Sequence, residues 1–251
     1  MRALVATAHG GPEVLELRED HPDPEPGAHD LLIEVHASAL NPVDAKIREG
    51  LLGERPAPFV LGFDVSGVVR AVGSAVRRVE PGDEVYASPS LARDGANAAL
   101  VCVDERLAAP RPRSLDHVQA AALPLVALTA WEALYDRVQV STDDVALIHA
   151  GAGGVGHVAI QLAKLRFARV VATASRPETK ALCRELGADE VIDHRERDFV
   201  DAVADLTGGR GCDVVFDTVG GDVFDRSLDC VALNGRMVTI VANESPHISG
   251  R

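Results

Sequence analysis

Three glycines, Gly151, Gly153 and Gly156, stand in the Gly-x-Gly-x-x-Gly spacing that binds the pyrophosphate of dinucleotides. An apolar run at 145–148 precedes them, and an amphipathic helical pattern follows. In such a turn one glycine permits the tight bend, one lets the backbone approach the pyrophosphate, and one lets helix and strand pack closely. The first N–H groups of the helix then face the phosphates. The candidate binding residues are Gly151, Ala152, Gly153, Gly154, Val155 and Gly156; a structural glycine turn in another α/β fold is the alternative.

Strands and helices alternate after the glycine turn. Apolar runs predict strands at 169–174, 190–192, 212–217 and 236–241, and helical periodicity predicts helices at 178–186, 198–206 and 223–233. This alternation is typical of a parallel sheet that is covered by helices on both faces. The second half of the chain is therefore predicted to be a doubly wound α/β domain.

Residues 1–110 have a different pattern. Short β-like runs recur at 2–7, 31–37, 64–72, 84–87 and 98–103, and clusters of glycine and proline separate them. This pattern predicts a mostly β, barrel-like domain. From Ser114, a candidate N-cap, the periodicity becomes helical, and Pro124 should divide it into two helices. The predicted domains are residues 1–115 and residues 116–251.

Charge and cysteine content restrict the class of partner. The 251 residues carry a formal net charge of −13, which disfavours nucleic acid or an anionic membrane as a partner. No apolar run has the length and flanks of a membrane span or a signal peptide. The four cysteines include no Cys-x-x-Cys pair, which is typical of a reducing compartment. The cytoplasm is the predicted location.

Several short motifs together resemble a known family. With the glycine turn, they are the stretches at 41–44 (NPVD), 61–67 (LGFDVSG), 82–86 (GDEVY), 128–131 (LTAW) and 217–221 (DTVGG). The chain resembles the medium-chain dehydrogenase/reductase superfamily, and within it the zinc-independent quinone oxidoreductases, the zeta-crystallin-like group. The resemblance implies an α/β protein with a GroES-like, mostly β catalytic domain and a Rossmann domain with a doubly wound parallel sheet. It also implies a homodimer or homotetramer.

The positions that hold zinc in other members of the superfamily lack the ligands. Zinc-dependent members have a cysteine near position 41, a histidine–acid pair near position 64 and a lobe of four cysteines. This chain has Asn41 and Phe63-Asp64 at those places, and no cysteine between Tyr86 and Ala98. Zinc requires three or four ligands that lie close together. We therefore expect hydride chemistry without a metal.

The loop after the second Rossmann strand distinguishes NAD from NADP. NAD-binding proteins usually carry an acid there, which holds the ribose 2′-hydroxyl. This chain has Ser175 and Arg176 instead, followed by Lys180, and a guanidinium suits a phosphate well. These residues predict NADPH as the cofactor; the alternative is that both cations are solvated charges at a helix start. The resemblance also assigns cofactor contacts to Thr129, His194, Val219 and Val241, with His194 where relatives often have tyrosine.

The resemblance implies hydride transfer from NADPH to a small-molecule quinone or to the β-carbon of an α,β-unsaturated carbonyl. Without a metal, the charge that develops on the carbonyl oxygen needs hydrogen-bond donors. Asn41 is the candidate donor, and Asp44 and Lys46 are expected to order its loop as an ion pair. The alternative role for Asn41 is a turn cap before Pro42.

Two other functions stay open. An enoyl-thioester reductase would share this scaffold, and a non-catalytic nucleotide-binding or structural protein would follow if a part of the catalytic domain is missing. Relatives continue past the fifth Rossmann strand. We therefore expect the strand edge at 235–241 to be covered by another subunit or by residues beyond Arg251.

Overall fold

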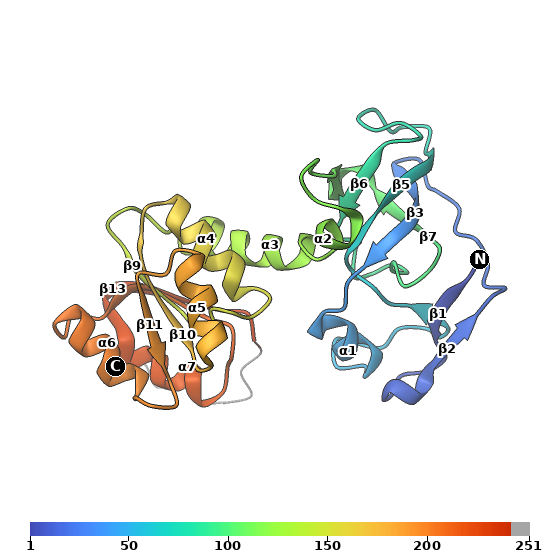
Figure 1. The fold of residues 1–251 in the computed structure, drawn as a ribbon. Helices are drawn as coiled ribbons and strands as arrows, with labels where there is room; N and C mark the ends of the chain where they lie inside the picture. The colour runs from blue at the N-terminus through green and yellow to red at the C-terminus, as the bar shows by residue number, and fades with distance from the viewer. Residues whose placement is uncertain (242–251) are drawn as a thin grey trace. The chain divides into compact units, whose positions relative to one another are not determined.

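The computed structural model describes residues 1–241, and its contacts divide the chain into Met1–Leu125 and a second unit that begins at Val126 (Figure 1). Helix α2 (His117–Ala121) packs on the strands of the first unit, and the boundary falls within α3 (Pro124–Trp131). The predicted break at Pro124 is confirmed. The N-cap of α2 is Asp116 and not Ser114, because the Asp116 carboxylate accepts from the Gln119 N–H at 2.8 Å.

Antiparallel sheets dominate the first unit, which confirms the predicted mostly β architecture. One sheet has the order β7-β3-β5-β6-β8, and a smaller sheet has the order β2-β1-β4. The strands are β1 (Ala3–Ala6), β2 (Leu15–Arg18), β3 (Asp30–Ser38), β4 (Phe59–Val60), β5 (Val65–Val72), β6 (Glu84–Ala87), β7 (Leu100–Asp104) and β8 (Ala108–Pro110). The sheets enclose buried apolar side chains that include Leu31, Ile33 and Val69. The strands β2, β4 and β8 add to the predicted ones; β4 has only two residues and β8 three, whereas sequence reasoning missed the alternating Leu-Glu-Leu-Arg of β2.

A short helix, α1 (Pro42–Arg48), occupies the stretch that the sequence suggested as a turn. Proline at the first helical position has the fixed backbone angle that a helix start needs. Asp44 at the third position accepts the backbone N–H of Asn41, which is the N-cap. The Asn-Pro pair therefore begins a helix, and this helix positions the candidate catalytic residues.

The second unit is a five-stranded parallel sheet among the described residues, with the order β11-β10-β9-β12-β13. Its strands are β9 (Val145–Ile148), β10 (Arg169–Ala174), β11 (Glu190–Asp193), β12 (Cys212–Asp217) and β13 (Val231–Thr239). Its helices are α4 (Gly156–Leu165), α5 (Pro177–Glu185), α6 (Phe199–Thr207) and α7 (Asp222–Ser227), and the six-residue π-helix η3 (Glu132–Arg137) follows α3 (Figure 1). The predicted doubly wound sheet is confirmed.

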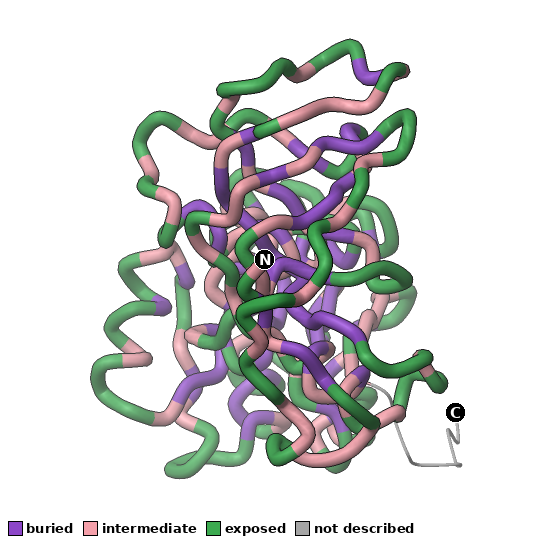
Figure 2. The backbone as a smooth tube through the Cα atoms, turned by 90° about the vertical axis from the view of Figure 1, so that its right-hand side faces the viewer, coloured by how far each residue is buried: buried purple, intermediate pink, exposed green. Residues whose placement is uncertain are grey.

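Alternate side chains of the central strand enter two different cores. Along β9, Ala146 and Ile148 pack with α4 and α5, whereas Val145 and Leu147 pack with α6. All four residues are buried, and the buried stretches of the chain run inside its exposed loops (Figure 2). Burial on both faces explains why this strand reads as an unbroken apolar run.

The predicted boundaries fail at the end of the described chain. The helix expected at 223–233 ends at Ser227, a short 3₁₀ turn (Leu228–Cys230) follows, and β13 begins at Val231, five residues before the predicted strand. Asn234 has a left-handed φ of 63° inside β13, and the pairing register with β12 shifts nearby. Because of this irregularity, the first residues of β13 do not follow the regular pattern from which strands are predicted.

Candidate active site

Asp44 fixes the loop that carries Asn41. Its carboxylate accepts the N–H of Asn41 at 2.8 Å and the N–H of Gly62 at 2.8 Å, so it joins the start of α1 to the loop before β5. The side chain is buried, and burial raises its pKa above the usual value. Asp44 therefore holds the backbone and is itself shielded from water.

The Asn41 amide is oriented by Asp64. Its Nδ2 donates to Asp64 Oδ2 at 2.7 Å, and the other carboxylate oxygen accepts the N–H of Leu125 at 2.7 Å. Asp64 is 1% exposed, and this burial raises its pKa to about 6. Asn41 thus occupies a helix cap, as the alternative interpretation expected, while its side chain is held by a buried carboxylate. Sequence reasoning used Asp64 only to exclude zinc and missed this role.

The expected ion pair between Asp44 and Lys46 is wrong. Among the ion pairs of residues 1–241, none joins these two side chains. They are two positions apart in α1, where side chains do not face each other. Asp44 orders the loop through backbone N–H groups instead.

The predicted cofactor residues of the second unit gather, with two exceptions, at one edge of its sheet. Parallel strands end at the same edge, and the residues that follow these ends are the turn 149–155 after β9, Ser175 and Arg176 after β10, His194 after β11, Val219 after β12 and Val241 after β13. The exceptions are Thr129, which is half-buried in α3, and Lys180, which lies in α5. The order of the strands reverses between β9 and β12, and such switch points bind ligands in doubly wound sheets.

The glycine turn is a close-packed cradle. A Cβ on Gly156 would lie 2.2 Å from the Ala150 carbonyl oxygen, and a Cβ on Gly151 would lie 2.8 Å from the Cβ of Ala172. None of the glycines 151, 153 and 156 has a positive φ; the left-handed residue of the turn is Ala150, with a φ of 46°. Gly151 and Gly156 are therefore required for close approach, and the roles expected of the three glycines towards a cofactor stay predictions.

The two predicted cations of the β10 loop differ in their surroundings. The Arg176 side chain is 65% exposed, with Glu178 at 3.5 Å as an ion-pair partner. Lys180 instead donates to Asp193 at 2.6 Å, at the end of β11, and this bond raises the pKa of the lysine. Ala174 lies opposite Asp193 in the β10–β11 register, so Ser175 and His194 follow side by side. Arg176 is the accessible cation, and Lys180 neutralises a neighbouring carboxylate.

Sequence reasoning also missed His149, which directly follows β9. It is 2% exposed, and burial lowers its pKa to about 4. Its ring nitrogens lie 3.3 Å from Thr173 Oγ1 and 2.9 Å from Ser227 Oγ, and Phe199 packs edge-on against it. A cavity of about 150 Å³ is lined by His149, Ala150, Thr173, His194, Phe199, Val219, Val223 and Arg226. Thr173, Phe199 and Ser227 are distant from His149 in the sequence, so the sequence alone does not reveal that they contact it.

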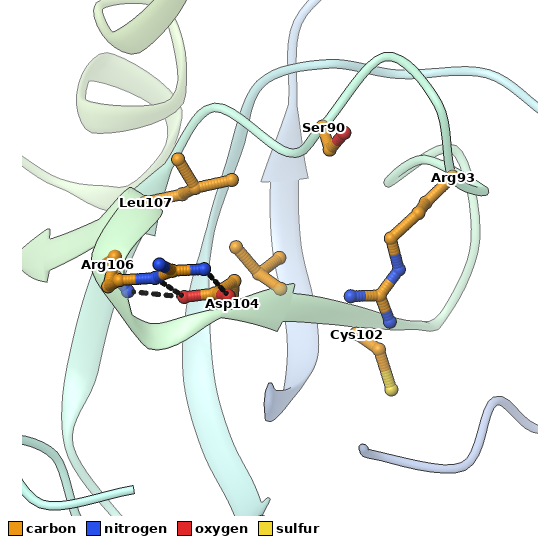
Figure 3. Close-up of a pocket in the computed structure, with 7 residues that line it drawn as sticks. Ser90, Arg93, Cys102, Asp104, Arg106 and Leu107 are labelled. Carbon is orange, nitrogen blue, oxygen red and sulfur yellow. Dashed lines mark hydrogen bonds and ion pairs between the residues drawn. The ribbon is translucent and has the colours of Figure 1, made fainter. Parts of the chain in front are cut away.

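A separate cavity of the first unit, about 460 Å³ in volume, lacks groups suited to catalysis (Figure 3). Asp104 and Arg106 form an ion pair at 2.7 Å, and Arg93 binds Asp30 through two hydrogen bonds. Burial raises the pKa of the Cys102 thiol to about 11, so it stays protonated near neutral pH. The charges of this cavity satisfy one another, and we assign no chemistry to it.

Within residues 1–241, no three His, Cys, Asp or Glu side chains are grouped as ligands of a metal ion. The expectation of hydride chemistry without a metal stays a prediction. No helix in the same part of the chain combines the length and apolar character that crossing a membrane requires.

A parallel sheet with a glycine turn at its switch point defines a dinucleotide-binding protein. Residues 27–113 match the family described as "Alcohol dehydrogenase GroES-like domain", and residues 154–248 match "Zinc-binding dehydrogenase". The quinone oxidoreductase of Rattus norvegicus is 33% identical over 252 aligned positions, and the match covers 100% of this chain and 76% of that protein. The chain belongs to the medium-chain dehydrogenase/reductase superfamily, in its quinone oxidoreductase group, which confirms the resemblance.

The descriptions of two further relatives name NADPH. The chloroplastic NADPH-dependent alkenal/one oxidoreductase of Arabidopsis thaliana is 40% identical over 256 aligned positions, and the match covers 98% of this chain and 64% of that protein. The structure of the Escherichia coli quinone oxidoreductase complexed with NADPH has a TM-score of 0.87 and 34% identity, and the match covers 100% of this chain and 76% of that chain.

Proposed function

We propose that this protein is an NADPH-dependent oxidoreductase that transfers hydride to a quinone or an α,β-unsaturated carbonyl, without zinc. The proposal rests on the residues that lie at one edge of the parallel sheet. There the glycine turn lies beside a loop that has Arg176 and no acid at the ribose position. The NADPH of the Escherichia coli structure and the substrates named for both relatives support the same cofactor and substrate classes.

The residues present fit the cofactor. Side chains at Gly151 and Gly156 would collide with neighbouring atoms, so the missing Cβ atoms let the turn pack closely against the sheet and α4, and the first N–H groups of α4 would face the pyrophosphate. Gly151, Ala152, Gly153, Gly154, Val155 and Gly156 would hold the pyrophosphate, Ser175, Arg176 and His194 the 2′-phosphate, and Thr129, Val219 and Val241 the remaining surface of the cofactor. Lys180 already binds the Asp193 carboxylate, so it would help the 2′-phosphate by neutralising a negative charge that would otherwise repel it.

Asn41 stabilises the substrate oxygen in this proposal. When bound, NADPH supplies a hydride from C4 of its nicotinamide, and negative charge then develops on the acceptor oxygen. One N–H of the Asn41 amide is held by Asp64, which leaves the second N–H in a fixed direction. A preorganised donor of this kind stabilises the developing charge without reorganising in the reaction. Asp44 holds the backbone of the loop, and Lys46 adds a positive charge on the same helix.

The acceptor is tested with purified protein and three substrates: 1,4-naphthoquinone, a simple enone and a crotonyl thioester. We expect NADPH oxidation with the quinone or the enone, and much slower oxidation with NADH. Turnover of the crotonyl thioester alone would favour an enoyl-thioester reductase. NADPH binding without any turnover would favour a non-catalytic nucleotide-binding protein.

The assembly and the location are proposed on separate grounds. Among the described strands, β13 pairs only with β12, and Leu233 on it is 93% exposed, which suits a homodimer or homotetramer that covers this edge. A monomeric mass by light scattering at assay concentration would contradict that assembly.

The four cysteines are buried free thiols, as expected for the cytoplasm, and fluorescence of a tagged protein in its own cell tests this location.

A further inference from the structure

A buried hydrogen-bond chain connects His149 to the glycine turn. His149 Nδ1 lies 3.3 Å from Thr173 Oγ1, and Thr173 Oγ1 accepts the backbone N–H of Ala150 at 3.0 Å. On the other side of the ring, Nε2 lies 2.9 Å from Ser227 Oγ. The chain of bonds therefore joins Ser227 of α7 and Thr173 of β10 to Ala150, the residue before the first glycine of the turn.

The partners determine where the protons lie. The Ser227 hydroxyl donates to the Val223 carbonyl, so its oxygen accepts from Nε2–H of His149. The neutral ring then presents a lone pair at Nδ1, and this lone pair takes the hydroxyl proton of Thr173. A lone pair of the Thr173 oxygen is left to accept the N–H of Ala150.

Ala150 sets the geometry of the turn. Its φ of 46° lies in the left-handed region, which is costly for a residue with a side chain unless its surroundings hold it there. Its carbonyl oxygen accepts the N–H of Gly153 at 2.8 Å and lies 2.2 Å from the position that a Cβ on Gly156 would take. A rotation of Ala150 would therefore move both the turn and the start of α4.

We infer that His149 is a positioning residue for the cofactor pyrophosphate: it directs the Thr173 hydroxyl, which holds Ala150 in the left-handed conformation that shapes the glycine turn. This inference rests on the proposed NADPH binding. It assigns a role to two side chains that lie below the turn and need not touch the cofactor. If His149 served only as a packing residue against Phe199, an aromatic ring without nitrogens would replace it without loss.

The test compares two ligands by calorimetric titration. NADPH carries the pyrophosphate, whereas 2′-AMP carries the 2′-phosphate and lacks the pyrophosphate. Thr173→Val removes the hydroxyl with little change of volume, Thr173→Ser restores it, and His149→Phe keeps a ring against Phe199. Thr207→Val is the matched control, because the Thr207 hydroxyl accepts the backbone N–H of Gly211, also at 3.0 Å, at the end of α6.

We expect the NADPH dissociation constant to rise about tenfold or more in both Thr173→Val and His149→Phe. In Thr173→Val the N–H of Ala150 loses its acceptor, and in His149→Phe the Thr173 hydroxyl loses the group that orients it. The constant for 2′-AMP should change by less than about twofold, and Thr173→Ser and Thr207→Val should bind NADPH as the unaltered protein does. Unchanged NADPH affinity in Thr173→Val and His149→Phe, or an equal loss for both ligands, would overturn the inference. If Thr173→Val does not fold, His149→Phe gives the same comparison. Failure of the unaltered protein to bind NADPH would instead contradict the proposed function.

Discussion

Replacing Asp64 by asparagine should separate stability from catalysis. In Asp64→Asn, the new Oδ1 can still accept the N–H of Leu125, but an amide nitrogen then faces the Nδ2 of Asn41. Two donors repel each other, so the Asn41 amide must turn its oxygen towards residue 64. The direction in which Asn41 offered its second N–H then carries a lone pair.

The magnitudes follow from the burial of Asp64 and from the loss of one donor. Its pKa is raised from 3.8 to about 6, so keeping the carboxylate ionised at pH 7 costs about 3 kcal/mol of folding free energy. The asparagine avoids that cost, and we expect a free energy of unfolding equal to or above that of the unaltered protein. Loss of one oxyanion donor costs about 3–4 kcal/mol in the transition state, so kcat should fall at least about 100-fold.

The assay pairs steady-state NADPH oxidation with a quinone and urea unfolding of the same preparations. The NADPH dissociation constant should not change, because Asp64 and Asn41 lie in the first unit and the glycine turn in the second. Asn41→Ala is the companion variant and should show the same fall in kcat. A kcat of the Asp64→Asn protein within about threefold of the unaltered value would refute the role given to the Asn41 amide.

Three further predictions concern the second unit. Arg176→Ala should raise the NADPH dissociation constant about fivefold to tenfold and leave that of NADH unchanged, because we assign the exposed guanidinium to the 2′-phosphate, which NADH lacks. Lys180→Ala should also weaken NADPH binding, and adding Asp193→Asn should restore it, because the lysine acts by neutralising that carboxylate. Burial lowers the pKa of His149 from 6.5 to about 4, so the unfolded chain binds more protons between these values, and this site should lose about 3 kcal/mol of stability as the pH falls from 6.5 to 4.

Titration calorimetry checks the two binding predictions, and amide exchange of β9 at pH 7 and pH 4.5 checks the third. Exchange must be followed strand by strand, because the raised pKa of Asp64 acts in the opposite sense: its protonation favours the folded first unit as the pH falls. Equal NADPH and NADH affinities in the unaltered protein would contradict the role of Arg176. The role of Lys180 would be refuted by a Lys180→Ala, Asp193→Asn double variant that binds NADPH as weakly as Lys180→Ala alone. Amide protection of β9 that does not fall at pH 4.5 would contradict the prediction for His149.

The architecture of the second unit could be predicted because its signals are local. The apolar run of β9, the glycine spacing and the alternation of strands with helices all lie within short stretches, and each matches the structure. β13 was placed too late, because its left-handed Asn234 and the register shift break the regular pattern. Helix α1 carries a local signal as well: proline at its first position and an acid at its third.

The hydrogen bonds that tune the site could not be predicted, because they connect residues that are distant in sequence. Asn41 and Asp64 are 23 positions apart, and His149 and Ser227 are 78 positions apart. The same limit made Lys180 appear as a free cation, although Asp193 lies 13 positions away on the neighbouring strand. Residue types indicated which groups could act, and only the folded sheet shows which of them are already paired.

The fate of the transferred hydrogen shows whether hydride passes from NADPH to the carbon skeleton of the substrate. NADPH deuterated at the transferring C4 position is incubated with the protein and a simple enone, and the product is analysed by mass spectrometry and NMR. We predict one deuterium on the former β-carbon of the saturated product. A product without deuterium at that carbon, or no consumption of NADPH with any enone or quinone, would contradict it.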